Sequence, residues 1–430
     1  MQPGDRIRVE QADVEYEGTV LPSSASDRLV LKLDDGYNVG IDRAEASVSV
    51  LEKAVHDFSD AGAGEGTSEI TADESLPTIS LISTGGTIAS TVDYRTGAVT
   101  AQFDAEDVLR AVPDLAGRAN YRGKVVTNIL SENMTPDVWQ ELAEAIYKEI
   151  ESGADGVVVM HGTDTMQYSA AAVAFMIDTP VPIVFTGSQR SADRPSSDNV
   201  MNAVCAVEAA KSDCAEVMIC MHKESSDTKC ALHRGTRARK SHTSRRDAFE
   251  TVGNKPLGTV DYSVANQEYI TDVEDNTTID SHLSFDREYT SRGEVTPDIQ
   301  PDIESNVDLI KFTPGMDEER IRSLADTEGV IIEGTGLGHI STDLIPAVEE
   351  LVDSGTVVVM TSQCIEGRVC DRVYDTGRDL LDAGVVEAED TLPETALVKL
   401  MWVLSNKDEP QRTMQKALAG EITEQSVPWT

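Results

Sequence analysis

The stretch that decides the fold is residues 78–88, TISLISTGGTI, in which an unbroken apolar run ends in a glycine turn that presents Thr87. Two further stretches repeat this design: GVVVM at residues 156–160 is followed by HGTDT, and KVVTNIL at residues 124–130 is followed by SEN. Strands that are apolar throughout are expected in parallel sheets covered on both faces. The three stretches therefore predict a parallel sheet whose strands end in polar turns.

Outward from these runs, strand-like and amphipathic helical stretches alternate over most of the chain. The best-marked helix follows Thr135, a predicted N-cap, and has Pro136 at its first position. A repeated β-α-β pattern predicts a doubly wound α/β architecture. We expect a first lobe at residues 77–262 and a smaller second lobe at residues 326–430, joined by a connecting segment at residues 263–325.

The N-terminal part has a different sequence pattern. Residues 1–55 contain short runs with strand composition, separated by polar turns that include Asp34-Asp35-Gly36. Asp-Gly between apolar residues is a strong hairpin signal. Four or five such strands predict a small β barrel that precedes the α/β lobes. Residues 56–76 are small and acidic, which is typical of a linker.

The charge of the chain excludes one class of function. The 430 residues include 76 acidic and 36 basic side chains, for a net charge of −40. Such a surface repels a polyanion, which excludes non-specific nucleic-acid binding over the whole molecule. Because the acidic residues are spread along the chain, we favour the cytoplasm of a halophile, where salt screens the self-repulsion. An ordinary acidic cytosolic enzyme is the alternative.

Other classes are excluded by patterns that the sequence lacks. No apolar run reaches the about 18 residues of a membrane helix, and the N-terminus has no signal-peptide core, which predicts a cytoplasmic protein without membrane association. The six cysteines contain no C-x-x-C and are expected to be buried free thiols. The seven histidines are scattered, so no metal site is predicted.

Polar side chains follow three of the predicted strands. These are Thr87 after the first, Thr163 and Asp164 after the second, and Ser131 and Glu132 after the third. A glycine-threonine turn before a helix is by itself most often an N-cap. Together, however, these groups suit a small zwitterion at the carboxyl edge of the sheet, with its amino group at the carboxylates and its carboxylate at hydroxyls and helix N-termini.

A second candidate element is the run RGTRARKSHTSRR at residues 234–246, in which six of 13 residues are cationic. A lysine among guanidinium groups has a depressed pKa, because like charges disfavour its ammonium form. Lys240 is therefore a candidate base that takes a proton from a threonine hydroxyl. A solvated turn is the alternative interpretation.

The motifs match a known family. Residues 84–88, TGGTI, and residues 161–165, HGTDT, resemble the two signature motifs of the bacterial-type L-asparaginases. Residues 131–135, SENMT, resemble their substrate-clamping segment, and Lys240 falls where that family has its active-site lysine. The resemblance covers roughly residues 77–420 and implies an asparaginase-like, two-lobed α/β fold. It implies a catalytic set that consists of Thr87, Thr163, Asp164 and Lys240.

The resemblance also implies the rest of the site. Ser131 and Glu132 would bind the substrate, and backbone N–H groups at the glycine turns would stabilise the oxyanion. In secreted members a tyrosine on a lid after the first motif completes the site, and Tyr94 is the tyrosine found there. A surface aromatic is the alternative for Tyr94. Which of Thr87 and Thr163 is acylated first stays open.

Two features are similar to one branch of the family, the D subunits of the archaeal glutamyl-tRNA(Gln) amidotransferases. They are the extra N-terminal domain and the run HRGTRARKSHTSRRDAF at residues 233–249. This resemblance implies a glutaminase in which Thr87 attacks the side-chain amide of glutamine or asparagine. The released ammonia would pass to a partner, the amidotransferase E subunit, which amidates Glu-tRNA(Gln). It also implies a homodimer within a heterotetramer.

Two other functions are compatible with parts of the sequence. A free-standing L-asparaginase shares every catalytic residue, and a tRNA-binding protein could use the cationic run alone. No ATP or Mg site is expected in this chain, and both would be used by the partner E subunit. Residues 334–338, GTGLG, follow a predicted strand, but the third glycine of a dinucleotide fingerprint falls on His339 and a P-loop is missing.

Overall fold

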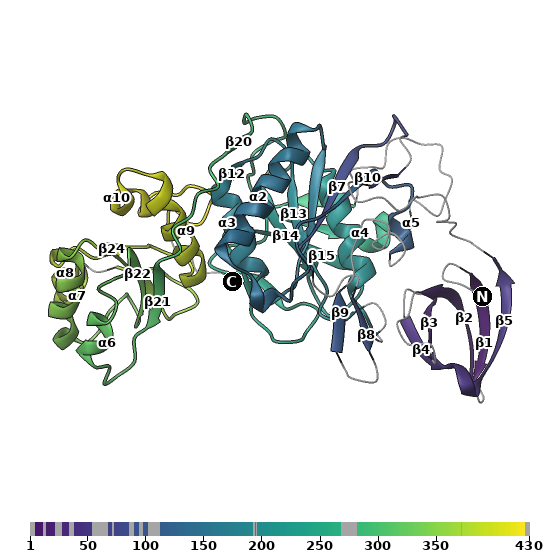
Figure 1. Ribbon diagram of the computed structural model, residues 1–430, viewed down its shortest axis with the longest axis horizontal. Helices are drawn as coiled ribbons and strands as arrows, with labels where there is room; N and C mark the ends of the chain where they lie inside the picture. Colours follow the sequence, from purple (N-terminus) through teal and green to yellow (C-terminus); the bar gives the residue numbers. More distant parts are fainter. Residues whose placement is uncertain are drawn as a thin grey trace.

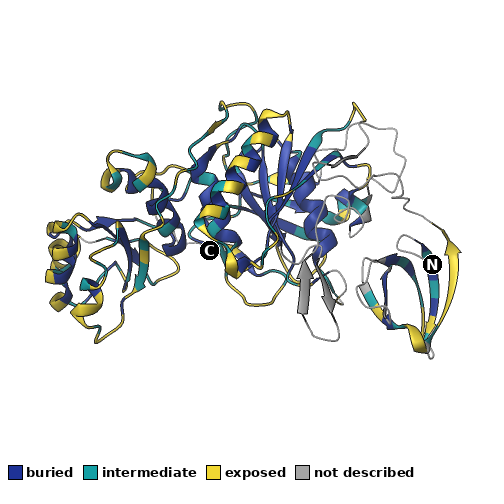
Figure 2. Ribbon diagram, in the orientation of Figure 1, coloured by how far each residue is buried: buried dark blue, intermediate teal, exposed yellow. Residues whose placement is uncertain are grey.

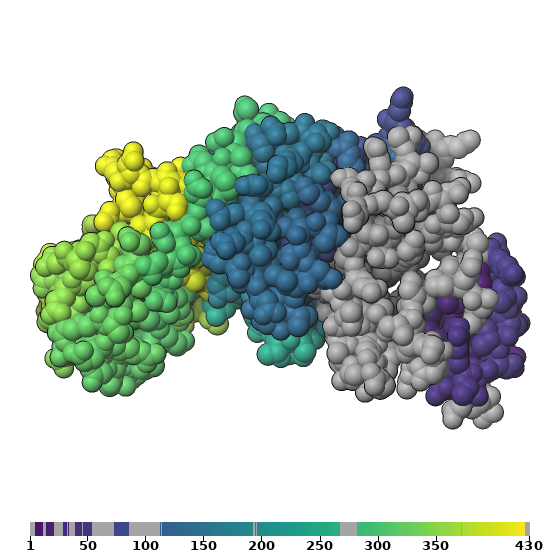
Figure 3. All heavy atoms as spheres, viewed as in Figure 1, coloured from purple at the N-terminus to yellow at the C-terminus, as the bar shows by residue number. Residues whose placement is uncertain are grey.

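The computed structural model shows three regions in chain order: an N-terminal sheet, a large α/β lobe and a smaller α/β lobe (Figure 1). The lobes adjoin each other, and the second projects from one side of the first (Figure 3). The structure describes residues 5–11, 14–21, 28–33, 38–53, 68–70, 73–85, 90–93, 98–101, 112–191, 194, 196–267, 282–370 and 372–425.

The N-terminal region is a five-stranded antiparallel sheet over the residues described there, in the order β4-β3-β2-β1-β5. Its interior is formed by apolar side chains such as Ile7, Val9 and Leu31. Asp34-Asp35-Gly36 lies outside the described residues, between two strands that pair antiparallel as the hairpin signal predicts. The strands are β1 (Arg6–Gln11), β2 (Val14–Leu21), β3 (Arg28–Leu33), β4 (Asn38–Asp42) and β5 (Ala46–Glu52).

The first lobe contains, among its described residues, a nine-stranded sheet in the order β19-β18-β15-β14-β13-β11-β7-β10-β6. Its five central strands pair in parallel, as predicted, and three of them, β11, β13 and β14, are almost entirely apolar. They are β7 (Thr78–Ser83), β10 (Asn120–Val125), β11 (Gly156–Met160), β13 (Ile183–Thr186) and β14 (Val217–His222). Antiparallel strands flank them: β6 (Ser68–Ile70), β15 (Lys229–Arg234), β18 (Gly258–Asp261) and β19 (Leu283–Phe285).

One strand lies elsewhere than the sequence predicts. The apolar run places it at residues 124–130, but β10 covers Asn120–Val125 and ends where most of that run begins. Its side chains alternate between buried and half-buried positions, so its sequence is not apolar throughout. The turn that follows nevertheless reaches the predicted edge of the sheet, because Val126 N donates to Ser83 O at 2.9 Å.

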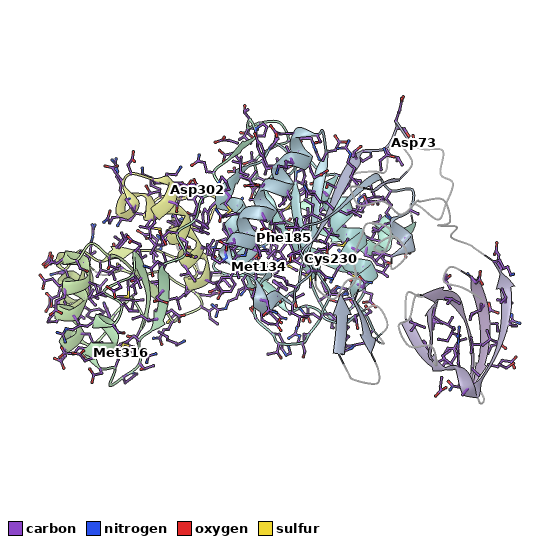
Figure 4. All side chains as sticks on the ribbon, viewed as in Figure 1. Asp73, Met134, Phe185, Cys230, Asp302 and Met316 are labelled. Carbon is purple, nitrogen blue, oxygen red and sulfur yellow. The ribbon has the colours of Figure 1, made fainter. Side chains whose placement is uncertain are left out.

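Helices cover both faces of this sheet (Figures 1 and 2). The Thr135 side chain caps the helix after it, accepting from Val138 N, and Gly153 with φ +84° follows its end. Phe185 belongs to the core on this side, and the half-buried Met134 packs against it; both are labelled in Figure 4. The helices are α2 (Pro136–Glu151) and α3 (Met166–Met176) on one face, with α4 (Asn199–Ala210) and α5 (Tyr262–Gln267) on the other.

The second lobe has a parallel sheet that comprises, in the part of the chain that the structure describes, four strands in the order β21-β22-β23-β24. Helix α9 packs against α3, and Phe175 stacks on Trp402 with ring centroids 6.2 Å apart, which joins the lobes. Its elements are β21 (Val307–Lys311), α6 (Glu318–Arg322), β22 (Gly329–Gly334), α7 (Ile345–Asp353), β23 (Val357–Ser362), α8 (Asp375–Asp382), β24 (Val386–Glu387), α9 (Pro393–Asn406) and α10 (Pro410–Met414).

Smaller elements complete the fold. Hairpins are formed by β8 (Ser90–Asp93) with β9 (Ala98–Ala101) and by β16 (Ala238–Lys240) with β17 (Phe249–Thr251), while β12 (Ile177–Asp178) pairs with β20 (Asp298–Ile299). Within the described residues, no helix has the length and apolar character needed to cross a membrane. Four of the six free cysteines are buried, whereas Cys364 is exposed and Cys370 is half-buried.

Candidate active site

The turn after β11 is held by a buried histidine. Nδ1 of His161 donates to Gly162 O at 2.7 Å, and its Nε2 lies 2.8 Å from Ser169 Oγ. Ser169 in turn accepts from Trp139 Nε1 at 2.9 Å. Burial lowers the pKa of His161 to about 4, so the ring is neutral near pH 7. The histidine therefore shapes the turn that carries Thr163.

The structure brings three of the predicted residues into direct contact. Nζ of Lys240 donates to Thr163 Oγ1 at 2.8 Å and to Asp164 Oδ1 at 2.6 Å. The Lys240 side chain is 9% exposed, whereas that of Asp164 is 67% exposed. Lys240 belongs to the β16–β17 hairpin, and its backbone N–H donates to Gln167 Oε1 of α3 at 3.3 Å. The amine is thus shielded, but its carboxylate partner faces solvent.

A close backbone approach places Ser131 against the same turn. A Cβ on Gly162 would lie 2.7 Å from the Cβ of Ser131, so only glycine fits there. The hydroxyl of Thr165 donates to Ser131 O at 2.7 Å, which fixes the short helix Ser131–Asn133. Ser131 is buried and Glu132 is exposed. The structure thus places the Ser131–Asn133 segment directly beside the turn that follows β11.

The end of β7 joins this edge as well. Thr84 N donates to Met160 O at 3.1 Å, and Ile129 N donates to Thr84 O at 3.1 Å. Gly85 has φ +103° and faces the backbone of Ile129 where a side chain would clash, so the turn requires glycine. Thr87 and Tyr94 lie outside the residues whose side chains the structure describes, and their places in the site stay predictions.

The expected surroundings of Lys240 need a correction. The sequence suggests a cluster of guanidinium charges at residues 234–246, but each arginine in this fully described run lies against a carboxylate. The pairs are Arg234 with Glu216 at 2.6 Å, Arg237 with Asp390 at 3.2 Å, Arg239 with Glu394 at 3.5 Å, Arg245 with Asp247, and Arg246 with Asp227. These carboxylates offset the guanidinium charges, and the run is not a free basic surface.

Sequence reasoning missed Gln167, which holds the backbone of Lys240. It lies on the first turn of α3, four residues after Thr163, and no sequence motif marks it. The structure also has hollows of about 550 Å³ and 260 Å³ that share Arg234 and Gly420, and none of the predicted site residues lines either. Among the described residues, no group of three or more His, Cys, Asp or Glu side chains could hold a metal.

Comparisons with known proteins first define the class. Family models match residues 78–271 as "Asparaginase, N-terminal", 306–417 as "Glutaminase/Asparaginase C-terminal domain" and 1–51 as "GatD N-terminal domain". The L-asparaginase of Thermococcus kodakarensis superposes with TM-score 0.69 and 29% identity, over 80% of this chain and 99% of its own. L-asparaginase I of Vibrio cholerae gives 0.66 and 26%, over 81% and 99%. The chain has the two-lobed asparaginase fold.

Full-length relatives then narrow the class. The glutamyl-tRNA(Gln) amidotransferase D subunit of Halobacterium salinarum is 65% identical, over 100% of this chain and 99% of the relative. The D subunit of Haloquadratum walsbyi is 62% identical over 99% of each chain, and that of Methanosarcina mazei 51% over 98% of each. This chain belongs to the family of glutamyl-tRNA(Gln) amidotransferase D subunits.

Proposed function

We propose that this chain is the ammonia-supplying glutaminase component of a Glu-tRNA(Gln) amidotransferase. The observation that carries the proposal is the contact of Lys240 Nζ with Thr163 Oγ1 and Asp164 Oδ1, in a chain similar over its full length to amidotransferase D subunits. A free-standing L-asparaginase has less support, because the chain also matches the model of the GatD N-terminal domain.

The proposed chemistry is nucleophilic attack by threonine. A threonine hydroxyl is a weak nucleophile until a base takes its proton, and the Lys240 amine lies within reach of Thr163 at 2.8 Å. Asp164 orients that amine and stabilises the ammonium that forms. Thr87 attacks the side-chain amide carbon of glutamine while the Thr163–Lys240 pair takes its hydroxyl proton. That proton goes to the amide nitrogen, which leaves as ammonia. Water then attacks the acyl-threonine, which releases glutamate and returns a proton to the Thr87 oxygen.

Substrate binding is proposed for the remaining polar groups of the edge. Ser131 and the exposed Glu132 lie on the short helix that Thr165 fixes, so Glu132 can pair with the α-amino group of glutamine. Backbone N–H groups at the glycine turns would stabilise the tetrahedral oxyanion, which lowers the barrier for amide cleavage. Tyr94 is the residue that we propose to close over the bound substrate.

The proposal extends to the partner and the setting. The E subunit, with ATP and Mg, would use the ammonia to convert Glu-tRNA(Gln) to Gln-tRNA(Gln), and two copies of this chain would form the centre of a heterotetramer. The net charge of −40 and the similarity to proteins of Halobacterium salinarum and Haloquadratum walsbyi support the cytoplasm of a halophilic archaeon.

Ammonia release from glutamine and from asparagine tests the function, measured with and without the E subunit and Glu-tRNA(Gln) in concentrated KCl. We expect release from glutamine to rise when partner and tRNA are both present, with Gln-tRNA(Gln) formed in step when ATP is added. Hydrolysis of asparagine that neither component changes, with no Gln-tRNA(Gln) formed, would instead support the free-standing L-asparaginase.

A further inference from the structure

The strand that carries Lys240 is not part of the large sheet. Strand β16 pairs only with β17 in a separate two-stranded hairpin, with Lys240 opposite Phe249, within the described residues. The place of the amine therefore depends on how the base of this hairpin is held. The base consists of residues 236–237 and of Val252, whose backbone N–H donates to Arg237 O at 3.0 Å.

Arg237 fixes this base from inside the protein, and its side chain is only 1% exposed. Its Nε donates to Val252 O at 3.0 Å, across the hairpin. Its Nη1 donates to Asp390 O at 3.0 Å and to Glu421 O at 2.7 Å, and lies 3.2 Å from Asp390 Oδ2. One guanidinium thus joins both strands of the hairpin to two segments of the second lobe.

Those two segments are themselves fixed. Thr423 donates to Asp390 from its backbone N–H at 3.0 Å and from its hydroxyl at 2.5 Å. Glu421 forms a fully buried pair with Lys399 at 2.6 Å. The carboxylate of Glu421 also accepts from the backbone N–H of Ala419 at 2.8 Å. The acceptors that Arg237 uses are therefore rigidly placed.

The neighbour of Arg237 repeats the arrangement. The hydroxyl of Thr236 donates to Ala419 O at 2.8 Å, and Thr236 O accepts from the hydroxyl of Thr395 at 3.0 Å. Arg239 lies 3.5 Å from Glu394. Residues 236, 237 and 239 therefore all contact the second lobe. Lys240 follows Arg237 by three residues, or about 10 Å of extended strand.

We infer that Arg237 is a positioning residue that transmits the fixed geometry of the second lobe to Lys240 and so sets the amine on Thr163. The inference rests on the proposed function, since it takes Lys240 to be the general base that accepts the threonine proton. Misplacement of a catalytic group by about 1 Å can cost about 100-fold in rate. Because the guanidinium of Arg237 joins both strands of the hairpin to the second lobe, its loss allows displacements of this size.

The variant Arg237→Lys tests this in the full chain with the E subunit. Lysine keeps a positive charge near Asp390 but lacks the planar fork that reaches three carbonyl oxygens at once. We expect kcat for glutamine hydrolysis to fall by about 10- to 100-fold, with KM changed by less than about threefold. The rate at which an acylating reagent modifies Lys240, followed by mass spectrometry, should rise severalfold because the amine leaves its shielded place.

Arg234→Lys is the matched control. Arg234 lies three residues earlier and makes a bidentate contact with Glu216 of the first lobe, at 2.6 and 2.8 Å. The same chemical change should lower the unfolding temperature but leave kcat within about twofold and the acylation rate of Lys240 unchanged. Equal losses of kcat in both variants, in proportion to their lost stability, would overturn the inference and leave Arg237 a structural residue.

Two further variants separate the possible failures. If Lys240→Ala abolishes activity but Arg237→Lys keeps it within about twofold, the inference is wrong and the proposed function stands. If Lys240→Ala itself keeps full activity, the proposed function fails instead. Should Arg237→Lys not fold, Asp390→Asn removes the charge but keeps the backbone acceptor. It should then lower kcat and raise the acylation rate of Lys240, and unchanged values would contradict the inference.

Discussion

Lys240 and Lys399 each lie 2.6 Å from a carboxylate oxygen, but the surroundings of the two contacts differ. Lys240 pairs with the largely exposed Asp164, whereas Lys399 and Glu421 are both fully buried. Lys399 donates further to two backbone carbonyl oxygens, at 2.9 and 2.6 Å, whereas Lys240 donates to the hydroxyl of Thr163. Contact distance therefore does not separate a structural lysine from a candidate base. The two kinds of lysine are separated by the second group to which the amine donates and by how far the paired carboxylate is exposed to solvent.

The largest effect is expected at the buried pair. Lys399→Ala leaves the Glu421 carboxylate buried without its cation, which should lower the free energy of unfolding by about 3–5 kcal/mol. Urea unfolding in concentrated KCl measures this. The double variant Lys399→Met with Glu421→Gln should regain most of the loss, because no uncompensated charge remains. A loss below about 1 kcal/mol in the single variant would place Lys399 in the same class as a surface lysine.

At Lys240 we expect a large loss of activity and little loss of stability. Lys240→Ala should lower glutamine hydrolysis by about 100-fold or more, the range of a removed general base, and change the free energy of unfolding by less than about 1 kcal/mol. Lys240→Arg is the control, because arginine keeps the ion pair with Asp164 but stays protonated. It should be as inactive as the alanine variant. Near-normal hydrolysis by either variant contradicts the role of a base.

Glu208, a carboxylate buried like Glu421, extends the comparison to pH. Glu208 lies 3.0 Å from Arg118, 3.1 Å from His282 and 2.6 Å from Lys211. Burial alone would raise the pKa of Glu208, but the hydrogen bond from His282 and the charges of Lys211 and Arg118 outweigh it and lower this pKa to about 2. The folded protein thus binds fewer protons at this site than the unfolded chain does.

Stability from Glu208 should therefore be complete above pH of about 4.5 and be lost as pH falls towards 2, by up to about 1.4 kcal/mol per pH unit. The measurement is the difference in free energy of unfolding between the natural chain and Glu208→Gln, followed from pH 6 downwards. This difference should shrink as the pH falls. A constant difference would mean that Glu208 has the same pKa in the folded protein as in the unfolded chain.

The smallest effect on basal glutamine hydrolysis is expected from removal of the N-terminal sheet. Removal of residues 1–67 leaves β6 and both contacts in place, so basal glutamine hydrolysis should stay within about twofold. Formation of Gln-tRNA(Gln) with the E subunit should fall much more if the N-terminal sheet is a docking element. The two rates are measured for the full and shortened chains, and equal losses would show that the sheet supports the catalytic fold itself.

Local signals predicted much of the fold and part of the site. The apolar runs and glycine turns identified two central strands, and the turns around Gly85 and Gly162 meet as expected. Strand β10 was misplaced because Asn120, Arg122 and Lys124 alternate with its buried residues and interrupt the apolar pattern. A search for continuous apolar runs therefore finds covered central strands and misses those with one half-buried face.

Long-range contacts could not be predicted from local patterns. Lys240 lies 77 residues from Thr163 in sequence, and only the family resemblance brought them together. The carboxylate partner of Arg237 is 153 residues away in the other lobe. Because such pairings depend on how the lobes pack, the sequence could show the charges of the cationic run but not their compensation.

The hydrogen bonds that hold residues 236–237 have a consequence for protein synthesis. The partners in these hydrogen bonds belong to residues 390–395 and 419–423. The ribosome adds these residues about 150–190 positions later, which takes roughly 10–40 s at ordinary elongation rates. During this interval the nascent chain carries Thr163, Asp164 and Lys240 without the contacts that fix the hairpin. On the inference that Arg237 positions Lys240, we expect glutamine hydrolysis only from chains that include residues 390–423, because shorter chains lack the contacts that place the amine.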